Sequence, residues 1–173
     1  MATITTEESI RRLGRLIAAG TIIEKKGWDK VWGKLEKDTG IKIQGALKMD
    51  IFIAELYVAG LPLLKFLGNK NLLNLMPRFN ESVIDNLKKE GYLKTKEEDD
   101  LLNILTNDRW PIYQTMAKNS AIDGCISSRP LDLFLTIAKR ITSIHNGSPY
   151  FESCVASGLL AIFDFSNKLI EST

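Results

Sequence analysis

The sequence predicts an all-α protein, a single domain over residues 1–173 with about seven to nine helices around a buried central helix. Three observations predict it. The stretch from Ile51 to Leu67 is apolar on nearly every side, and only Glu55 and Lys65 within it carry charge. Elsewhere, apolar residues recur at steps of three and four, the spacing of a helix face. No alternating stretch offers a partner strand for a sheet.

The central stretch should form a helix, because a helix that is apolar all round belongs inside a core. Gly60 and Pro62 should stop or kink it, which gives two pieces, Gln44–Ala59 and Pro62–Leu67. A strand over Ile51–Val58 is the alternative, since that stretch is rich in Ile, Phe and Tyr. The stretch is too short to cross a bilayer, which takes about 20 predominantly apolar residues.

Length and composition favour one soluble globular domain. The chain has 173 residues, of which 45% are hydrophobic and 25% charged, and its net charge is +2. A charge so close to zero implies neither a polyanion nor an acidic partner. Cys125 and Cys154 lack the spacing of metal ligands, and the N-terminus lacks the apolar segment of a secretory signal. These features predict a cytoplasmic protein.

The N-terminal part should supply two helices. The first is expected over about Thr6–Ala19, with apolar residues on one face and a stop at Gly20. The second is expected over about Thr21–Lys37, where Trp28 and Trp32 lie on the same face. The sequence Asp-Thr-Gly at 38–40 should end it.

The middle of the chain carries strong helix-start signals. Asn80 is expected to cap a helix that runs to Glu90, with Gly91 at the C′ position. Thr95 and Glu98 form a capping box at the start of the next helix. A further helix is expected to open at Arg109-Trp110-Pro111, because proline suits the first helical position.

Two helices should complete the fold. One runs from Arg129 or Pro130 to His145, and the other from Ser148-Pro149 to about Ile170. The first is apolar over more than half of its circumference, more than one layer of contacts requires. It is therefore either internal or meets another protein chain with part of its surface.

Common catalytic and cofactor signatures are missing, so we expect no catalytic residue, no metal and no cofactor. No phosphate loop, H-E-x-x-H or C-x-x-C sequence occurs, and a single histidine cannot build a multi-histidine metal centre. An enzyme without a recognisable motif would have to bring several reactive residues into one cleft. The candidates for such a cluster are Asp50, Glu55, Arg109, Tyr113, Cys125 and His145.

The favoured function is a non-enzymatic cytoplasmic module for protein interaction or regulation. It would act through apolar helix surfaces, with a protein partner or a second copy in a homodimer. The alternative is a sensor or carrier of a small apolar ligand, with a pocket beside the central helix. Glu55 would orient that ligand, because a charge inside an apolar helix must find a partner or take up a proton. The pocket residues would be Glu55, Tyr57, Trp28 and Trp32.

A nucleic-acid-binding role is the third alternative. The stretch Ser82–Lys94, SVIDNLKKEGYLK, resembles the recognition helix and first wing residues of a winged helix, with Lys88 and Lys89 as phosphate contacts. The acidic run Glu-Glu-Asp-Asp that follows at 97–100 would repel phosphate. We therefore expect no nucleic-acid partner.

Overall fold

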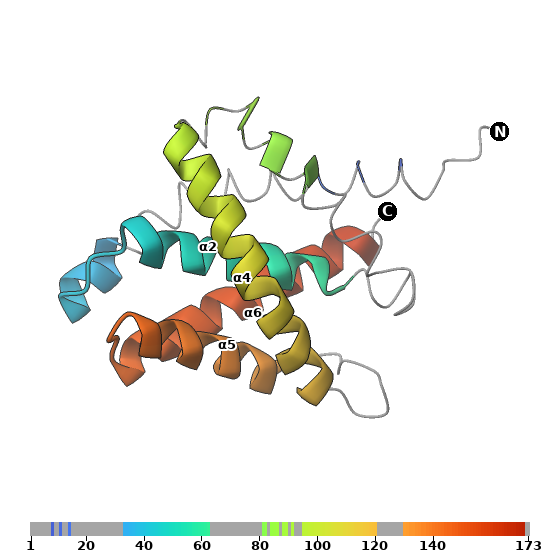
Figure 1. Cartoon of the computed structure of the whole chain (residues 1–173). Helices are drawn as coiled ribbons and strands as arrows, with labels where there is room; N and C mark the ends of the chain where they lie inside the picture. Colours follow the sequence, from blue (N-terminus) through green and yellow to red (C-terminus); the bar gives the residue numbers. More distant parts are fainter. Residues whose placement is uncertain are drawn as a thin grey trace.

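The computed structural model is helical wherever an element can be described. It describes residues 33–62, 95–120 and 130–171, together with positions 8, 11, 14, 81–82, 84–86, 88–89 and 91. The helices with described bounds are α2 (Gly45–Gly60), α4 (Lys96–Ser120), α5 (Leu131–Ile144) and α6 (Pro149–Glu171). Figure 1 shows α4 crossing α2, with α5 and α6 running beside each other. The described residues contain no strand.

Helix α2 is the predicted apolar helix. It spans Gly45–Gly60 with Gln44 as its N-cap, so the first predicted piece is confirmed to within one residue. The strand alternative for Ile51–Val58 is wrong. Of the residues in that segment, all but Glu55 are buried, and Ile53 and Val58 are completely so. Most of the second piece predicted, Pro62–Leu67, lies outside the described residues.

A short helical segment at 33–39 leads into α2. Gly40 ends it as predicted, with a φ of 72° and an N–H that donates to the Glu36 carbonyl at 2.8 Å. The Glu36 carboxylate then accepts a hydrogen bond from the Ile43 amide at 2.6 Å, which fixes the approach to α2. Positions 8, 11 and 14 of the predicted first helix are helical, and the rest of that helix lies outside the described residues. Of the predicted second helix, residues 33–37 are helical, whereas its earlier residues, including Trp28 and Trp32, lie outside the described residues.

Helix α4 corrects one prediction. The sequence indicated a new helix at Arg109-Trp110-Pro111, but Lys96–Ser120 is one helix of 25 residues with Pro111 inside it. Proline removes one amide donor and crowds the carbonyl four residues earlier, which costs about 3 kcal/mol. Pro111 itself is exposed, whereas Arg109 before it and Tyr113 after it pack inward. Inward contacts on both sides of the proline offset this cost, so the helix continues through Pro111.

Helices α5 and α6 form an antiparallel pair joined by a tight turn. The turn is a Schellman motif: Asn146 has a φ of 53°, and the Gly147 N–H donates to the Thr142 carbonyl at 2.8 Å. Ser148 caps α6, since its hydroxyl accepts a hydrogen bond from the Phe151 amide at 3.2 Å. The predicted ends of both helices are confirmed to within one or two residues.

The core lies where α2 meets the other described helices. Helix α2 contacts α4, α5 and α6, and α5 packs along α6, where the rings of Phe134 and Phe163 lie 5.5 Å apart. The largest fully buried side chains come from all four helices: Ile53, Tyr113, Leu133, Phe134, Ile137, Ile141, Phe151 and Phe163. None of the helices in the described part of the chain is both long enough and apolar enough to span a membrane.

Candidate functional site

A buried carboxylate lies at the junction of three elements. Asp50, in the second turn of α2, is 1% exposed. It shares a stripe with Ile53, Ala54 and Tyr57, which follow it at three, four and seven residues and are at most 5% exposed. A carboxylate in such surroundings must have partners, because an isolated buried charge is very costly.

The partners of Asp50 are Arg109 of α4 and His145 at the end of α5. Arg109 Nε donates to Asp50 Oδ1 at 2.8 Å, and Arg109 Nη2 donates to Asp50 Oδ2 at 3.5 Å. His145 Nε2 lies 2.7 Å from the same Oδ2 atom. One carboxylate therefore ties α2, α4 and the α5–α6 turn together. We call these three residues the Asp50 network.

The turn after α5 positions the histidine. His145 is the C-cap of α5, and its amide donates to the Ile141 carbonyl at 3.1 Å. Gly147 is needed there, because a Cβ at this position would lie 2.8 Å from Thr142 Cγ2 and 3.0 Å from Phe151 Cδ1. The sequence prediction that His145 lies at a helix end is confirmed.

Arg109 is held by more than one carboxylate. Its Nη1 atom also contacts Asp108 Oδ2 on the surface, and 14% of the Arg109 side chain is exposed. The hydrogen bond to Asp50 raises the pKa of the guanidinium, partly against the effect of burial. Arg109 thus carries its charge at every physiological pH and lies between the buried carboxylate and the surface.

Two tyrosines pack beside the network. The rings of Tyr57 and Tyr113 are 5.5 Å apart, and Tyr57 also meets Trp110 edge-on at 5.9 Å. Burial raises the pKa of both phenols, and the charge of Asp50 adds to the rise at Tyr113. The Tyr113 hydroxyl has no hydrogen-bond partner among the described residues. Both phenols remain neutral at physiological pH.

The Asp50 network holds α2, α4 and the end of α5 together; we call this structural role the clamp. Asp50 orients the imidazole of His145, as a carboxylate does for a general base. Nucleophilic catalysis also needs a hydroxyl or thiol within reach of the base. Within the described part of the chain, Asp50 is the only side chain shown to bond His145. A carboxylate that bonds Arg109 and His145, side chains from two separate elements, ties those elements together.

The residues proposed for an enzyme divide into two groups. Asp50, Arg109 and His145 meet through hydrogen bonds, and Tyr113 lies close enough to be influenced by their charges. Glu55 is on the same helix as Asp50 but is partly exposed. Cys125 lies outside the described residues. Cys154 is a partly buried free thiol.

Of the four residues proposed for a ligand pocket, the structure describes two, Glu55 and Tyr57. Tyr57 is 5% exposed and lies in the aromatic cluster with Trp110 and Tyr113. Glu55 is partly exposed on α2. Trp28 and Trp32 lie outside the described residues, so the pocket itself stays a prediction.

The lysines proposed for nucleic-acid binding precede α4 in the chain, and one of them contacts its first turn. Lys88 Nζ pairs with Asp99 Oδ2 at 2.8 Å, and Lys89 is exposed. Asp99 belongs to the acidic run that we expected to repel phosphate. Because the Lys88 ammonium is already paired with the Asp99 carboxylate, a phosphate contact at Lys88 is further disfavoured.

Large apolar side chains remain exposed on α5 and at the start of α6. Leu131 is 47% exposed and Leu135 is 39% exposed, and the two lie one helical turn apart on α5. Ile144, at 43%, lies on the other flank of α5, and Tyr150, at 55%, is on α6. The outer face of α5 consists of Asp132, Leu135, Thr136, Lys139 and Ser143, all exposed and turned away from the buried stripe, with exposed Leu131 at its edge.

Sequence reasoning missed Asp50 as the buried carboxylate and selected Glu55 instead. A usable signal was present, because Asp50 precedes the apolar positions 53, 54 and 57 at helical spacing. His145 carries a similar signal, four residues after the buried Ile141. A charged residue that continues an apolar stripe is thus a candidate for a buried pair.

The described residues contain no group of three or more side chains arranged to hold a metal ion. Comparisons of the chain with models of protein families, with curated proteins and with solved structures find no match.

Proposed function

We propose that this protein is a non-enzymatic cytoplasmic module for protein interaction or regulation, and that the outer face of α5 is its binding surface. One observation carries the proposal: Leu131 and Leu135 are neighbours on this face, and 47% and 39% of their surfaces are exposed. Burying the side chain of one leucine completely is worth about 1.5–3 kcal/mol. A partner that covers both would gain a useful part of its binding free energy from them.

The rest of the structure supports this role by giving α5 a rigid base. The opposite side of α5 is fixed in the core by Leu133, Phe134 and Ile137, each 0% exposed. The C-terminal end is held by His145 on Asp50. A surface on a helix fixed at both its inner face and its end loses little conformational entropy on binding.

The proposal includes the architecture around that base. All helices of the chain, seven to nine in the sequence prediction, would pack as a single domain around α2. The contacts of α2 with α4, α5 and α6 support this arrangement. The alternative of a small apolar ligand depends on Trp28 and Trp32 and remains a prediction.

Photocrosslinking tests the proposal directly. A photoreactive phenylalanine analogue is introduced at Leu135 of the full chain in its natural host, and at Asn103, an exposed residue of α4, as the matched control. The expected result is a crosslinked protein adduct that forms from position 135 and not from position 103. Adducts from neither position, or equally from both, would contradict a binding surface on α5.

A further inference from the structure

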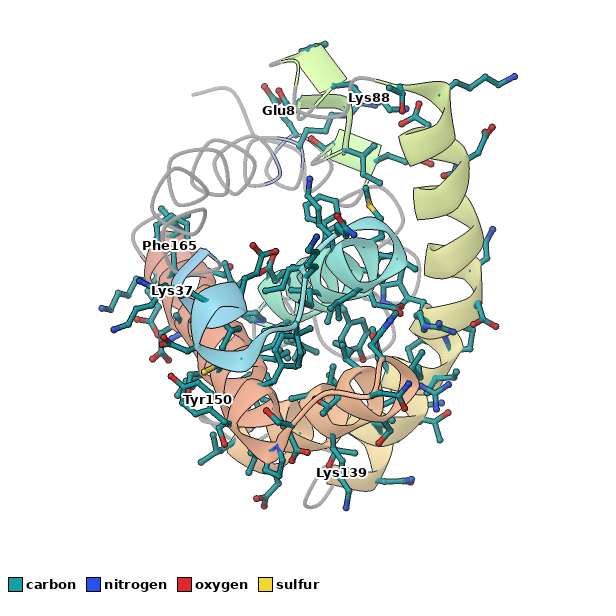
Figure 2. The ribbon with its side chains drawn as sticks, turned by 90° about the vertical axis from the view of Figure 1, so that its left-hand side faces the viewer. Glu8, Lys37, Lys88, Lys139, Tyr150 and Phe165 are labelled. Carbon is teal, nitrogen blue, oxygen red and sulfur yellow. The ribbon has the colours of Figure 1, made fainter. Side chains whose placement is uncertain are left out.

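We infer that the partner of the outer face of α5 is the same face of a second copy, packed antiparallel about a two-fold axis. This inference rests on the proposed function and names its partner. Charge complementarity between the two copies favours this pairing. Asp132 and Lys139 lie on the face, on either side of Leu135, and Figure 2 shows Lys139 at the edge of the molecule, far from Lys88.

The spacing of the charges fits a two-fold axis. Asp132 and Lys139 are seven residues apart, about 10 Å along the helix, so they cannot pair with each other. A two-fold axis that passes between positions 135 and 136 places Asp132 of each copy opposite Lys139 of the other. The same symmetry operation forms both ion pairs, as an isologous interface requires.

The apolar residues occupy the remaining positions of this pairing. Leu135 of each copy lies next to the axis, against Leu135 and Thr136 of the other copy. Leu131 lies at the rim, where the aliphatic stem of Lys139 from the other copy covers it. A parallel pairing would instead place Asp132 against Asp132 and Lys139 against Lys139, and like charges repel.

The face is small, so the dimer should be reversible. A helix of 14 residues is about 21 Å long, and contacts along one such face bury less than the roughly 1,600 Å² of a standard interface. Weak association of this kind is expected to respond to single charges, which makes charge exchange a sensitive test.

Sedimentation velocity of the full chain over a concentration series tests the inference. The wild-type chain should form dimers. Asp132→Lys alone and Lys139→Asp alone should each weaken the dimer about tenfold or more, since each places like charges opposite each other twice. An equimolar mixture of these two variants should dimerise again, because both lysines on the face of the first variant then meet aspartates on the face of the second. The double variant should also dimerise.

Two further variants complete the design. Leu135→Lys should abolish the dimer, whereas Asp100→Lys, the same charge change on exposed α4, should leave it unchanged. Circular dichroism confirms that each variant folds, as expected for exposed positions. A wild-type chain that remains monomeric, a dimer unaffected by Leu135→Lys, or a mixture that fails to recover would overturn the inference. An adduct with a different protein from position 135 would still support the proposed function.

Discussion

Asp50 should contribute strongly to stability through its two bonded partners. Asp50→Asn removes the charge that Arg109 and His145 share, and it leaves a 14% exposed guanidinium facing an amide. Removing one partner of a buried pair costs about 3–5 kcal/mol. Urea denaturation should show a loss of this size, while Asp100→Asn on exposed α4 should cost less than about 1 kcal/mol. An Asp50→Asn loss no larger than that of Asp100→Asn would refute the clamp.

The buried tyrosines beside the Asp50 network predict that the folded state loses stability at alkaline pH. Burial raises the pKa of Tyr57 and Tyr113 above the ordinary value of 10.0, so the folded state favours the neutral phenol. The resulting stability is complete below pH 10 and is lost as the pH rises toward the raised values. Ultraviolet absorbance of tyrosinate should therefore increase together with unfolding. Tyrosinate signal from these two residues in the folded protein would contradict their burial.

Tyr113→Phe isolates one of the two phenols. The hydroxyl has no hydrogen-bond partner among the described residues, so its removal should leave the melting temperature at neutral pH unchanged or higher. At alkaline pH the variant should lose stability less steeply than the wild-type chain, because one titrating group is gone. If the variant lost stability as steeply as the wild-type chain, ionisation of Tyr113 would not contribute to alkaline unfolding.

Single residues were harder to predict from the sequence than elements. Glu55 was selected because it interrupts the longest apolar stretch, whereas Asp50 lies at its edge. Which of two charges on one helix is buried depends on where the neighbouring helices cross it, here α4 and the end of α5. That crossing depends on contacts between residues 59 and 95 positions apart, which no local pattern encodes.

The turn between α5 and α6 is the element on which the position of His145 depends. In Gly147→Ala, the new Cβ would clash with Thr142 and Phe151. Such overpacking costs about 1–3 kcal/mol, measurable by thermal or urea denaturation. Gly33→Ala is the matched control: nothing lies within 4 Å of its Cβ position, so alanine should stabilise that helix by up to about 1 kcal/mol. Equal effects at the two glycines would contradict a tight turn.

Element boundaries followed local chemistry wherever that chemistry was decisive. The Gly40 stop, the Asn146-Gly147 turn and the Ser148 cap set ends that the sequence predicted. Pro111 failed as a start signal, because the inward contacts of Arg109 and Tyr113 on either side of it offset the penalty of an internal proline. Local signals place helix ends reliably only when tertiary contacts do not compete with them.

At the scale of the whole molecule, a few side chains depart from the usual division between an apolar core and a polar surface. The chain buries a carboxylate between α2, α4 and α5, while leucines remain outside on α5. Composition could predict neither feature, because a near-zero net charge and 45% hydrophobic residues are compatible with many arrangements. The excess apolar circumference of α5 was visible in its sequence, and it marks the surface that we assign to a partner.

The most direct test of that assignment is a crosslinking scan over exposed positions of several helices. The photoreactive group is placed in turn at Leu131, Leu135 and Lys139 on α5, at Lys118 on α4 and at Ala161 on α6. The predicted result is that the three α5 positions yield protein adducts and the other two do not. Adducts concentrated on α4 or α6, or an absence of adducts from α5, would contradict the account.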